Sequence, residues 1–260
     1  MSGMFGMPEL KRFVLEARAA ENVERFGAIM AEVTAALGFD YFALAHHVDV
    51  RSHGPYFGQL LKYGSIAVTN YPQEWQAFYV TKSLVNLDPV LLAAQRTNVG
   101  FLWEHMDRLI TLTPEQRRVL ARARKMGVGD GYTVPANVPG ESCGSCNFAV
   151  TPKRSINLEI IPMAQLVGSF AFNAARVLAK RSLENRAIEP VRLTDRQLQC
   201  IALVGRGKTD WEIAQLLGIS EQTVKQHIAE ARARYGVSKR VQLVTWALFD
   251  GALPLSQLIG

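Results

Sequence analysis

The last seventy residues carry a dense series of helix start and stop signals. Thr194 stands three residues before Gln197, and Thr209 stands three residues before Glu212. This T-x-x-Q/E spacing is the capping box that opens a helix. Gly218 ends the second helix, because glycine accepts the left-handed backbone of a helix end, and a serine two residues later caps a third. Two helices joined by so short a turn have helix-turn-helix geometry.

The third of these helices has one apolar stripe and one polar face. The stripe recurs at helical spacing and is expected to face the core: Val224, Ile228, Ala231 and Tyr235. The other side offers amides, cations and one small residue, which suit base edges and phosphates: Gln222, Lys225, Gln226, Ala229 and Arg232. Taken alone, these polar residues are better explained as a solvated helix face. The caps, the turn and the stripe together favour DNA binding.

The net charge permits a polyanionic partner without requiring one. The chain has 29 basic and 23 acidic side chains, a net charge of +6. The segment 188–260 has a net charge of only about +2, so a DNA footprint must come from clustering. The clustered cations are Lys225, Arg232, Arg234, Lys239 and Arg240.

Residues before the helix-turn-helix alternate between helical and strand patterns. Helices are expected over 9–37 (one helix or a broken pair), over 73–96 with a break near Asp88-Pro89, over 113–126 and over 156–186. Aromatic and β-branched runs predict strands at 39–48, 65–71, 131–138 and 146–151. This order predicts an α+β fold, an α-β-α sandwich around an antiparallel sheet, followed by an all-α four-helix domain. The boundary is expected near 186–192, which gives domains 1–185 and 186–260.

Several function classes find no support in the sequence. Three cysteines make no disulfide framework, and Cys143-x-x-Cys146 lacks the second pair or histidine of a zinc site. That pair is read as incidental, with a redox switch as the alternative. His46-His47 is read as one packed and one exposed histidine. No signal peptide, no apolar run near ~20 residues and no Ser/His/Asp constellation is found. We therefore expect a cytoplasmic protein that binds rather than catalyses, with no cofactor, no metal and no membrane partner.

The C-terminal domain resembles that of LuxR-type regulators. Its matching pieces are L-T-x-R, G-K-T, E-I-A, L-G-I-S-E-x-T-V-K-x-H and G-V-x-x-R. Three positions depart from the family: Gln197 replaces an acidic residue but still serves the capping box, Ile201 replaces leucine, and Trp246 replaces a small residue. The residues expected to contact DNA are Lys208, Thr209, Gln222, Thr223, Lys225, Gln226, His227 and Arg232.

The N-terminal domain resembles the acyl-homoserine lactone receptors of the same family. The resemblance rests on Tyr71-Pro72-x-Glu74-Trp75, Tyr79, Asp88-Pro89 and Trp103, with Gly131 at a family glycine position. A receiver domain, the other common partner of such a C-terminal domain, would need an acidic pocket, a late lysine and a doubly wound pattern. None of these is found in the sequence.

The resemblance implies a role for each of these side chains. Asp88 accepts a hydrogen bond from the lactone's amide N–H, Trp75 donates to the ring carbonyl, and Tyr71 donates to the acyl carbonyl. Tyr79 and Trp103 line the pocket. Asn147 stands where the family often has serine or threonine. It is larger and both donates and accepts, so we expect a polar, aromatic or unusual acyl group.

The sequence therefore predicts a ligand-responsive transcription regulator that senses an acyl-homoserine lactone. It is expected to bind a two-fold symmetric operator as a homodimer, with RNA polymerase as a further partner. One alternative keeps the DNA-binding domain but makes the N-terminal domain an orphan module for another small molecule or a protein. A third interpretation, a cytosolic hydrolase carrying a helix-turn-helix, has the least support.

Overall fold

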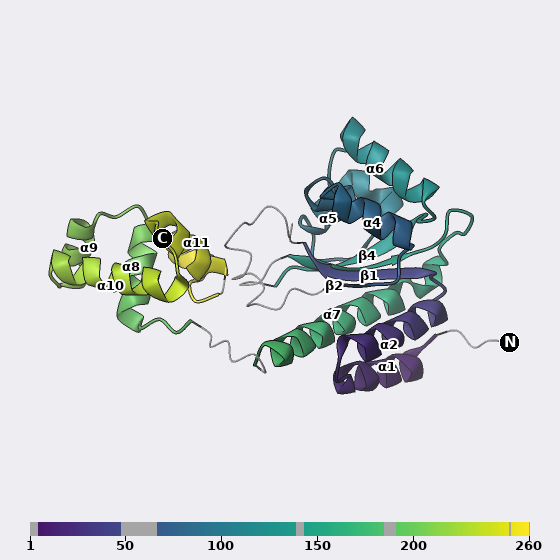
Figure 1. The fold of residues 1–260 in the computed structure, drawn as a ribbon, viewed down its shortest axis with the longest axis horizontal. Helices are drawn as coiled ribbons and strands as arrows, with labels where there is room; N and C mark the ends of the chain where they lie inside the picture. The colour runs from purple at the N-terminus through teal and green to yellow at the C-terminus, as the bar shows by residue number, and fades with distance from the viewer. Residues whose placement is uncertain (1–4, 48–66, 139–142, 185–190, 250, 260) are drawn as a thin grey trace. The chain divides into compact units, whose positions relative to one another are not determined.

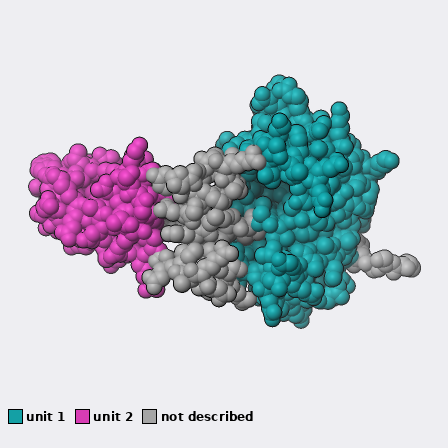
Figure 2. Space-filling model, viewed as in Figure 1, with its two compact units in different colours: residues 1–137, 142–188 teal, residues 138–141, 189–260 magenta. Residues whose placement is uncertain are grey.

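The computed structural model describes residues 5–47, 67–138, 143–184, 191–249 and 251–259 (Figure 1). The chain divides into two compact units (Figure 2). Unit 1 comprises residues 1–137 and 142–188, and unit 2 comprises residues 138–141 and 189–260. The domain boundary expected after residue 185 falls among residues outside the described ranges.

Unit 1 is built on a five-stranded antiparallel sheet in the order β2-β1-β5-β4-β3. The strands are β1 (Tyr41–His46), β2 (Ala67–Thr69), β3 (Phe101–Leu102), β4 (Gly131–Ala136) and β5 (Gly144–Ala149). In the central strands Ala43 lies opposite Asn147, and Asn147 lies opposite Thr133. The register thus sets side chains from distant parts of the sequence next to one another on one face.

Helices cover both faces of this sheet, which confirms the expected α-β-α sandwich (Figure 1). One face carries α1 (Met7–Ala19), α2 (Val23–Ala36) and α7 (Ile161–Glu184). The opposite face carries α4 (Gln73–Thr81), α5 (Pro89–Ala94) and α6 (Pro114–Lys125). The described residues also include the 3-10 turns η2 (Leu84–Asn86), η3 (Trp103–Arg108), η4 (Leu158–Ile160) and, near the C-terminus, η5 (Leu255–Gln257).

Alternation along the strands separates an apolar face from a mixed one. Phe42, Leu44, Val134, Cys146 and Phe148 are buried in the main core with α1, α2 and α7. The residues between them in sequence face α4–α6 instead, and they include polar side chains. The candidate site therefore lies over the mixed face.

Helix α7 corrects one expectation from the sequence. The stretch Leu158–Ala179 has 22 residues and a mean hydropathy of 1.2, so it is long and apolar enough to cross a membrane. Ala164, Val167 and Ala171 on this helix are fully buried in the core of unit 1. The stretch thus behaves as the amphipathic core helix of a sandwich, apolar because one side packs against the sheet.

Unit 2 contains α8 (Asp195–Gly205), α9 (Asp210–Leu217), α10 (Glu221–Tyr235) and α11 (Arg240–Phe249). Both capping boxes are present, and Gly218 ends α9 with a φ of 65°. The predicted stripe of α10 is buried together with Ile201, Ile213 and Leu243. The all-α helix-turn-helix expectation is confirmed.

The remaining expectations for unit 1 hold with smaller differences. The 9–37 region is a broken pair, since Asn22 caps α2 through the backbone N–H of Arg25. The expected helix over 73–96 is three short pieces, and Asp88 caps the last of them. Strand β3 was not predicted, because two residues are too few to show a period.

Candidate ligand site and DNA-binding surface

Aromatic side chains from α4 gather over the mixed face of the sheet. Trp75 and Tyr79 are four residues apart, so they share one side of the helix, with ring centroids 5.6 Å apart. Tyr71, just before the helix, packs its ring edge-to-face on Tyr41 of β1 at 5.9 Å. Trp75 is only 5% exposed. The structure therefore brings four of the predicted ligand residues, Tyr71, Trp75, Tyr79 and Trp103, into one cluster with Tyr41.

Asp88 joins this cluster from the N-terminus of α5. Its Oδ1 accepts from the backbone N–H of Val90 at 2.9 Å, and its Oδ2 accepts from the Tyr79 hydroxyl at 2.9 Å. Burial raises the pKa of the Asp88 carboxyl, and the bond from Tyr79 opposes that shift. No Lys or Arg within the described ranges forms an ion pair with it. Asp88 is thus both a helix cap and a half-buried acceptor held by neutral donors.

Two hydrogen-bond donors in the same cluster have no partner among the described residues. Neither the Tyr71 hydroxyl nor the Trp75 indole N–H forms a hydrogen bond with a residue that the structure describes. Burial and the nearby Asp88 charge raise the pKa of Tyr71, so its hydroxyl stays protonated and available to donate. Neither donor atom is among the buried polar atoms that lack a partner, so both are accessible and can donate to the acceptors of a bound molecule.

Trp103 and Asn147 lie further along the sheet and already have partners. The Trp103 indole N–H donates to Thr133 Oγ1 at 2.8 Å, and Thr133 donates to Asn147 Oδ1 at 2.7 Å. Gly131 makes room for Trp103, because a Cβ there would lie 2.6 Å from Trp103 Cε2. The two residues are therefore linked through Thr133, a connection that needs the strand register and that sequence patterns did not reveal.

The paired histidines differ from their expected state, and the paired cysteines do not. His46 and His47 are both half-buried on opposite faces, so the expectation of an exposed histidine is wrong. His46 packs edge-to-face on Phe172 at 5.3 Å, while His47 Nε2 lies 2.9 Å from Ser145 Oγ. Cys143 and Cys146 are free thiols, the second within the core. In the described ranges no three His, Cys, Asp or Glu residues are arranged to hold a metal.

The polar face of α10 is exposed, with its charged groups paired along the helix. Gln222, Lys225 and Gln226 are exposed, whereas Thr223 and His227 on its flank are half-buried. Lys225 Nζ lies 2.7 Å from Glu221 Oε1, and Gln226 donates to Glu230 at 3.0 Å. Such exposed pairs contribute little to stability, so their members can exchange partners at small cost.

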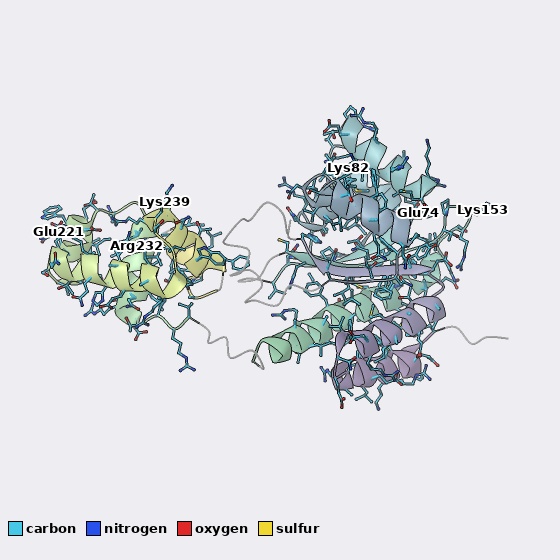
Figure 3. The ribbon with its side chains drawn as sticks, in the orientation of Figure 1. Glu74, Lys82, Lys153, Glu221, Arg232 and Lys239 are labelled. Carbon is cyan, nitrogen blue, oxygen red and sulfur yellow. The ribbon has the colours of Figure 1, made fainter. Side chains whose placement is uncertain are left out.

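Arg232 has a structural contact that sequence did not suggest. Figure 3 labels Glu221 and Arg232 on α10. One Arg232 nitrogen, Nη1, donates to the carbonyl of Ser238 at 2.7 Å, while its Nε is buried without a partner in the described part of the chain. The side chain therefore fastens the turn after α10, and its second terminal nitrogen is left for another acceptor.

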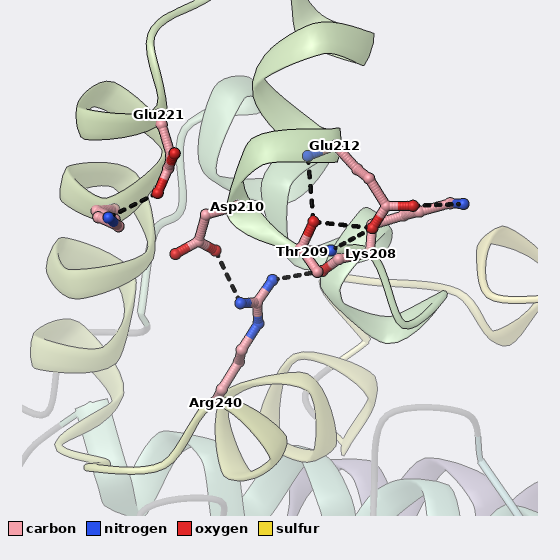
Figure 4. A network of polar contacts seen from close by, with 7 residues as sticks. Lys208, Thr209, Asp210, Glu212, Glu221 and Arg240 are labelled. Carbon is pink, nitrogen blue, oxygen red and sulfur yellow. Dashed lines mark hydrogen bonds and ion pairs between the residues drawn. The ribbon is translucent and has the colours of Figure 1, made fainter.

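Lys208 and Thr209 belong to a polar network at the start of α9 (Figure 4). Thr209 and Glu212 form the capping box, and Lys208 Nζ lies 3.2 Å from Glu212 Oε1. Arg240 joins α11 to this corner, with Nη1 2.7 Å from Asp210 Oδ1 and Nη2 2.7 Å from the Lys208 carbonyl. The network fixes the N-terminus of α9, whose free N–H groups favour anions.

Comparisons with known proteins agree with this architecture. Residues 22–175 match the family described as autoinducer binding domain, and residues 191–247 match bacterial regulatory proteins of the luxR family. Transcriptional activator protein AhyR of Aeromonas hydrophila is 24% identical over 94% of this chain and 92% of its own. The quorum sensing-dependent transcriptional regulator RpaR of Rhodopseudomonas palustris is 30% identical over 71% of this chain and 74% of its own.

A solved structure shows the same fold over nearly the whole length. SdiA, an Escherichia coli protein, in complex with octanoyl-rac-glycerol, aligns with a TM-score of 0.67 at 22% identity over 92% of each chain. The matched segments cover both units, and most of unit 1 falls within the autoinducer binding domain. The chain therefore belongs to the LuxR family of bacterial transcription regulators, with an autoinducer binding domain followed by a helix-turn-helix DNA-binding domain.

Proposed function

We propose that this protein is a cytoplasmic quorum-sensing regulator that binds an acyl-homoserine lactone with residues 1–185 and DNA with residues 186–260. It acts by binding and not by catalysis, as a homodimer on a two-fold symmetric operator, with RNA polymerase as its further partner. One observation carries the ligand assignment: the half-buried Asp88 carboxylate, an acceptor, lies beside two side chains whose donors have no partner among the described residues, Tyr71 and Trp75.

The lactone class has the complementary set of groups. It offers one amide N–H for Asp88 and two carbonyl oxygens for the donors of Trp75 and Tyr71. The carboxylate keeps free lone pairs after accepting from Tyr79 and Val90, so a third donor fits. Octanoyl-rac-glycerol, the molecule in the SdiA complex, lacks an amide N–H and is the natural competitor in a binding panel.

The test is calorimetric titration of a lactone panel against three variants. Asp88→Ala should weaken binding by about 1–3 kcal/mol, because the amide N–H is then buried unpaired. Asp88→Asn keeps the oxygen that caps α5 but turns an amide donor toward the ligand, so it should also bind weakly while folding normally. Trp75→Phe keeps the ring and should be milder. Asp107→Ala, at an exposed aspartate, is the matched control.

Lactone binding that survives both Asp88 substitutions would contradict the assigned site. A panel of straight, branched and aromatic acyl groups in which no lactone binds would favour the orphan alternative. Binding of the acylglycerol alone would replace the lactone class with a glycerol ester.

The DNA surface is tested by separating base contacts from phosphate contacts. Gln226→Ala should relax preference at one base position of each half-site, since a glutamine pairs with adenine through two hydrogen bonds worth about 1–3 kcal/mol. Arg232→Ala should weaken binding to all sequences and flatten the salt dependence by roughly one unit per protomer. Titration against a randomised operator library at two salt concentrations measures both effects.

Each DNA assignment has its own contrary result. If Gln226→Ala lowered the affinity for all operator sequences equally, we would assign Gln226 to the phosphate backbone of the DNA and not to a base. If Arg232→Ala weakened binding but left the salt slope unchanged, Arg232 would not contact a phosphate, because each phosphate contact contributes to that slope. Its role would then be the structural contact with the Ser238 carbonyl.

A further inference from the structure

A continuous chain of hydrogen bonds crosses the mixed face of the sheet, from Trp103 to His47. Beyond the Trp103–Thr133–Asn147 link, Asn147 Nδ2 lies 3.0 Å from Ser145 Oγ, and Ser145 Oγ lies 2.9 Å from His47 Nε2. Asn147 Nδ2 also donates to the carbonyl of Ala43 at 3.1 Å. The chain thus connects the aromatic cluster at one end with a histidine at the other.

The first three bonds in this chain have a fixed direction. An indole N–H can only donate, so Thr133 accepts from Trp103 and gives its single hydroxyl proton to Asn147 Oδ1. The Asn147 amide nitrogen then donates to Ser145 Oγ, which leaves the Ser145 proton available for His47 Nε2. When Ser145 gives its proton to Nε2, the ring proton of a neutral imidazole lies on Nδ1.

His47 is held in that neutral form. Burial, with a smaller contribution from His46, lowers its pKa to about 4. Its Nδ1 is buried and has no hydrogen-bond partner within the described ranges. The result is a neutral N–H donor that is shielded from water and has no acceptor, which is costly unless another molecule supplies one.

The position of this donor relates it to the ligand cluster. Tyr41, Ala43, Ala45 and His47 alternate onto the same face of β1, and Tyr41 belongs to the aromatic cluster. His47 follows the last residue of β1 and lies six residue steps from Tyr41, which is about 20 Å at 3.3–3.4 Å per step. The small side chains of Ala43 and Ala45 lie between the two. A ligand whose head binds at Asp88 can extend its tail along this floor.

We propose that His47 is a specificity residue and that the cognate acyl chain carries a neutral acceptor oxygen, a keto, hydroxyl or ether group, remote from the lactone ring. His47 Nδ1–H donates to that oxygen, and the chain through Ser145, Asn147 and Thr133 holds the imidazole in the donating tautomer. The inference rests on the proposed lactone function and names the subclass of lactone.

The experiment compares lactones of equal acyl length, either unsubstituted or carrying one oxygen at successive positions. The native protein should bind one oxygenated isomer about tenfold more tightly than the plain chain, a difference of about 1.4 kcal/mol. His47→Leu should abolish this preference while keeping affinity for the plain chain. His46→Leu, on the same strand but the opposite face, is the matched control and should retain it.

The outcomes separate this inference from the proposed function. Lactones that bind without any preference for oxygen, or a preference that survives His47→Leu, would overturn the role of His47 alone. A panel in which no lactone binds would overturn the lactone function and this inference with it. Asp88→Asn should weaken plain and oxygenated lactones by the same factor, because it acts at the head and not at the tail.

A second measurement needs no ligand and no substitution at His47. Nitrogen-15 correlation spectra of the histidine side chains report which ring nitrogen carries the proton. The native protein should show His47 as the Nδ1–H tautomer at neutral pH, and Ser145→Ala should shift it toward a tautomeric mixture. A native His47 protonated on Nε2 would reverse the bond between Ser145 and His47 and refute the proposal.

Discussion

The two units of this protein are specified over different sequence distances. In unit 2 the bonds that set helix ends join neighbours, as in Thr209 with Glu212, three residues apart. In unit 1 the bonds that build the candidate site join strands that are far apart, 30 residues from Trp103 to Thr133 and 98 from His47 to Ser145. The helix ends of unit 2 are thus set by neighbouring residues, whereas the candidate ligand site forms only once the sheet has brought distant strands together.

The largest expected effect tests whether the two units are stabilised separately. Phe148 is fully buried in unit 1 and packs on Phe39 with ring centroids 5.4 Å apart. Phe148→Ala should therefore destabilise unit 1 by about 3–5 kcal/mol, through lost burial and the cavity left behind. Scanning calorimetry of the full chain should show one transition moving to lower temperature while the other stays in place.

The reciprocal variant is the control. Leu243 is fully buried in unit 2, and Leu243→Ala should cost about 2–5 kcal/mol in the other transition only. If either substitution moved both transitions together, the units would share one cooperative fold, and the contrast between them would have no energetic basis.

The same contrast explains what sequence could and could not predict. The caps at Thr194 and Thr209 and the turn at Gly218 were predictable because each needs only a few neighbouring residues. The cluster of Trp75, Asp88 and Tyr79 was found through a family resemblance, and its bond from Tyr79 to Asp88 spans nine residues. Such a contact depends on how α5 packs, which no local period encodes.

The residues that sequence missed lie at the longest range. Thr133 and Ser145 are ordinary strand residues that nothing in their neighbours marks, and His47 was noted only as one of a histidine pair. They meet because the register places Thr133 opposite Asn147 and because alternation turns all of them to one face. A slip of one residue would move each to the other side, so the site is a property of the sheet.

A moderate loss of stability is expected when the N-terminal cap of α9 in unit 2 is removed. Thr209 accepts from the backbone N–H of Glu212, and Thr209→Ala removes this cap from α9. The change should lower the stability of unit 2 by about 1 kcal/mol, measured as a shift of its denaturant midpoint. Thr209→Ser keeps the hydroxyl and should be close to native. A cost as large as that of Leu243→Ala would mean that the cap organises the core as well.

The smallest expected effect is a pH dependence that each unit carries at one glutamate in the first turn of a helix. Hydrogen bonds from the Thr209 backbone and hydroxyl, then from Lys208, lower the pKa of Glu212 from 4.5 to about 2. Its contribution is therefore complete above pH 4.5 and is lost as pH falls toward 2, where the folded carboxylate protonates. Glu9 in unit 1 is held similarly: the Glu9 and Gly6 backbone N–H groups lower its pKa, and the bond from Gly6 is 2.9 Å long.

Neutral variants convert this pH dependence into a comparison of the units. Glu212→Gln should flatten the acid slope of the unit 2 transition alone, and Glu9→Gln should flatten that of unit 1 alone. The measurement is thermal unfolding between pH 2 and pH 5, with both transitions followed in each variant. Because both carboxylates are solvent-exposed, the changes should be smaller than that of Thr209→Ala. A Glu212→Gln variant with the native acid slope would show that α9 is fastened by Arg240 and Asp210 and not by its own capping box.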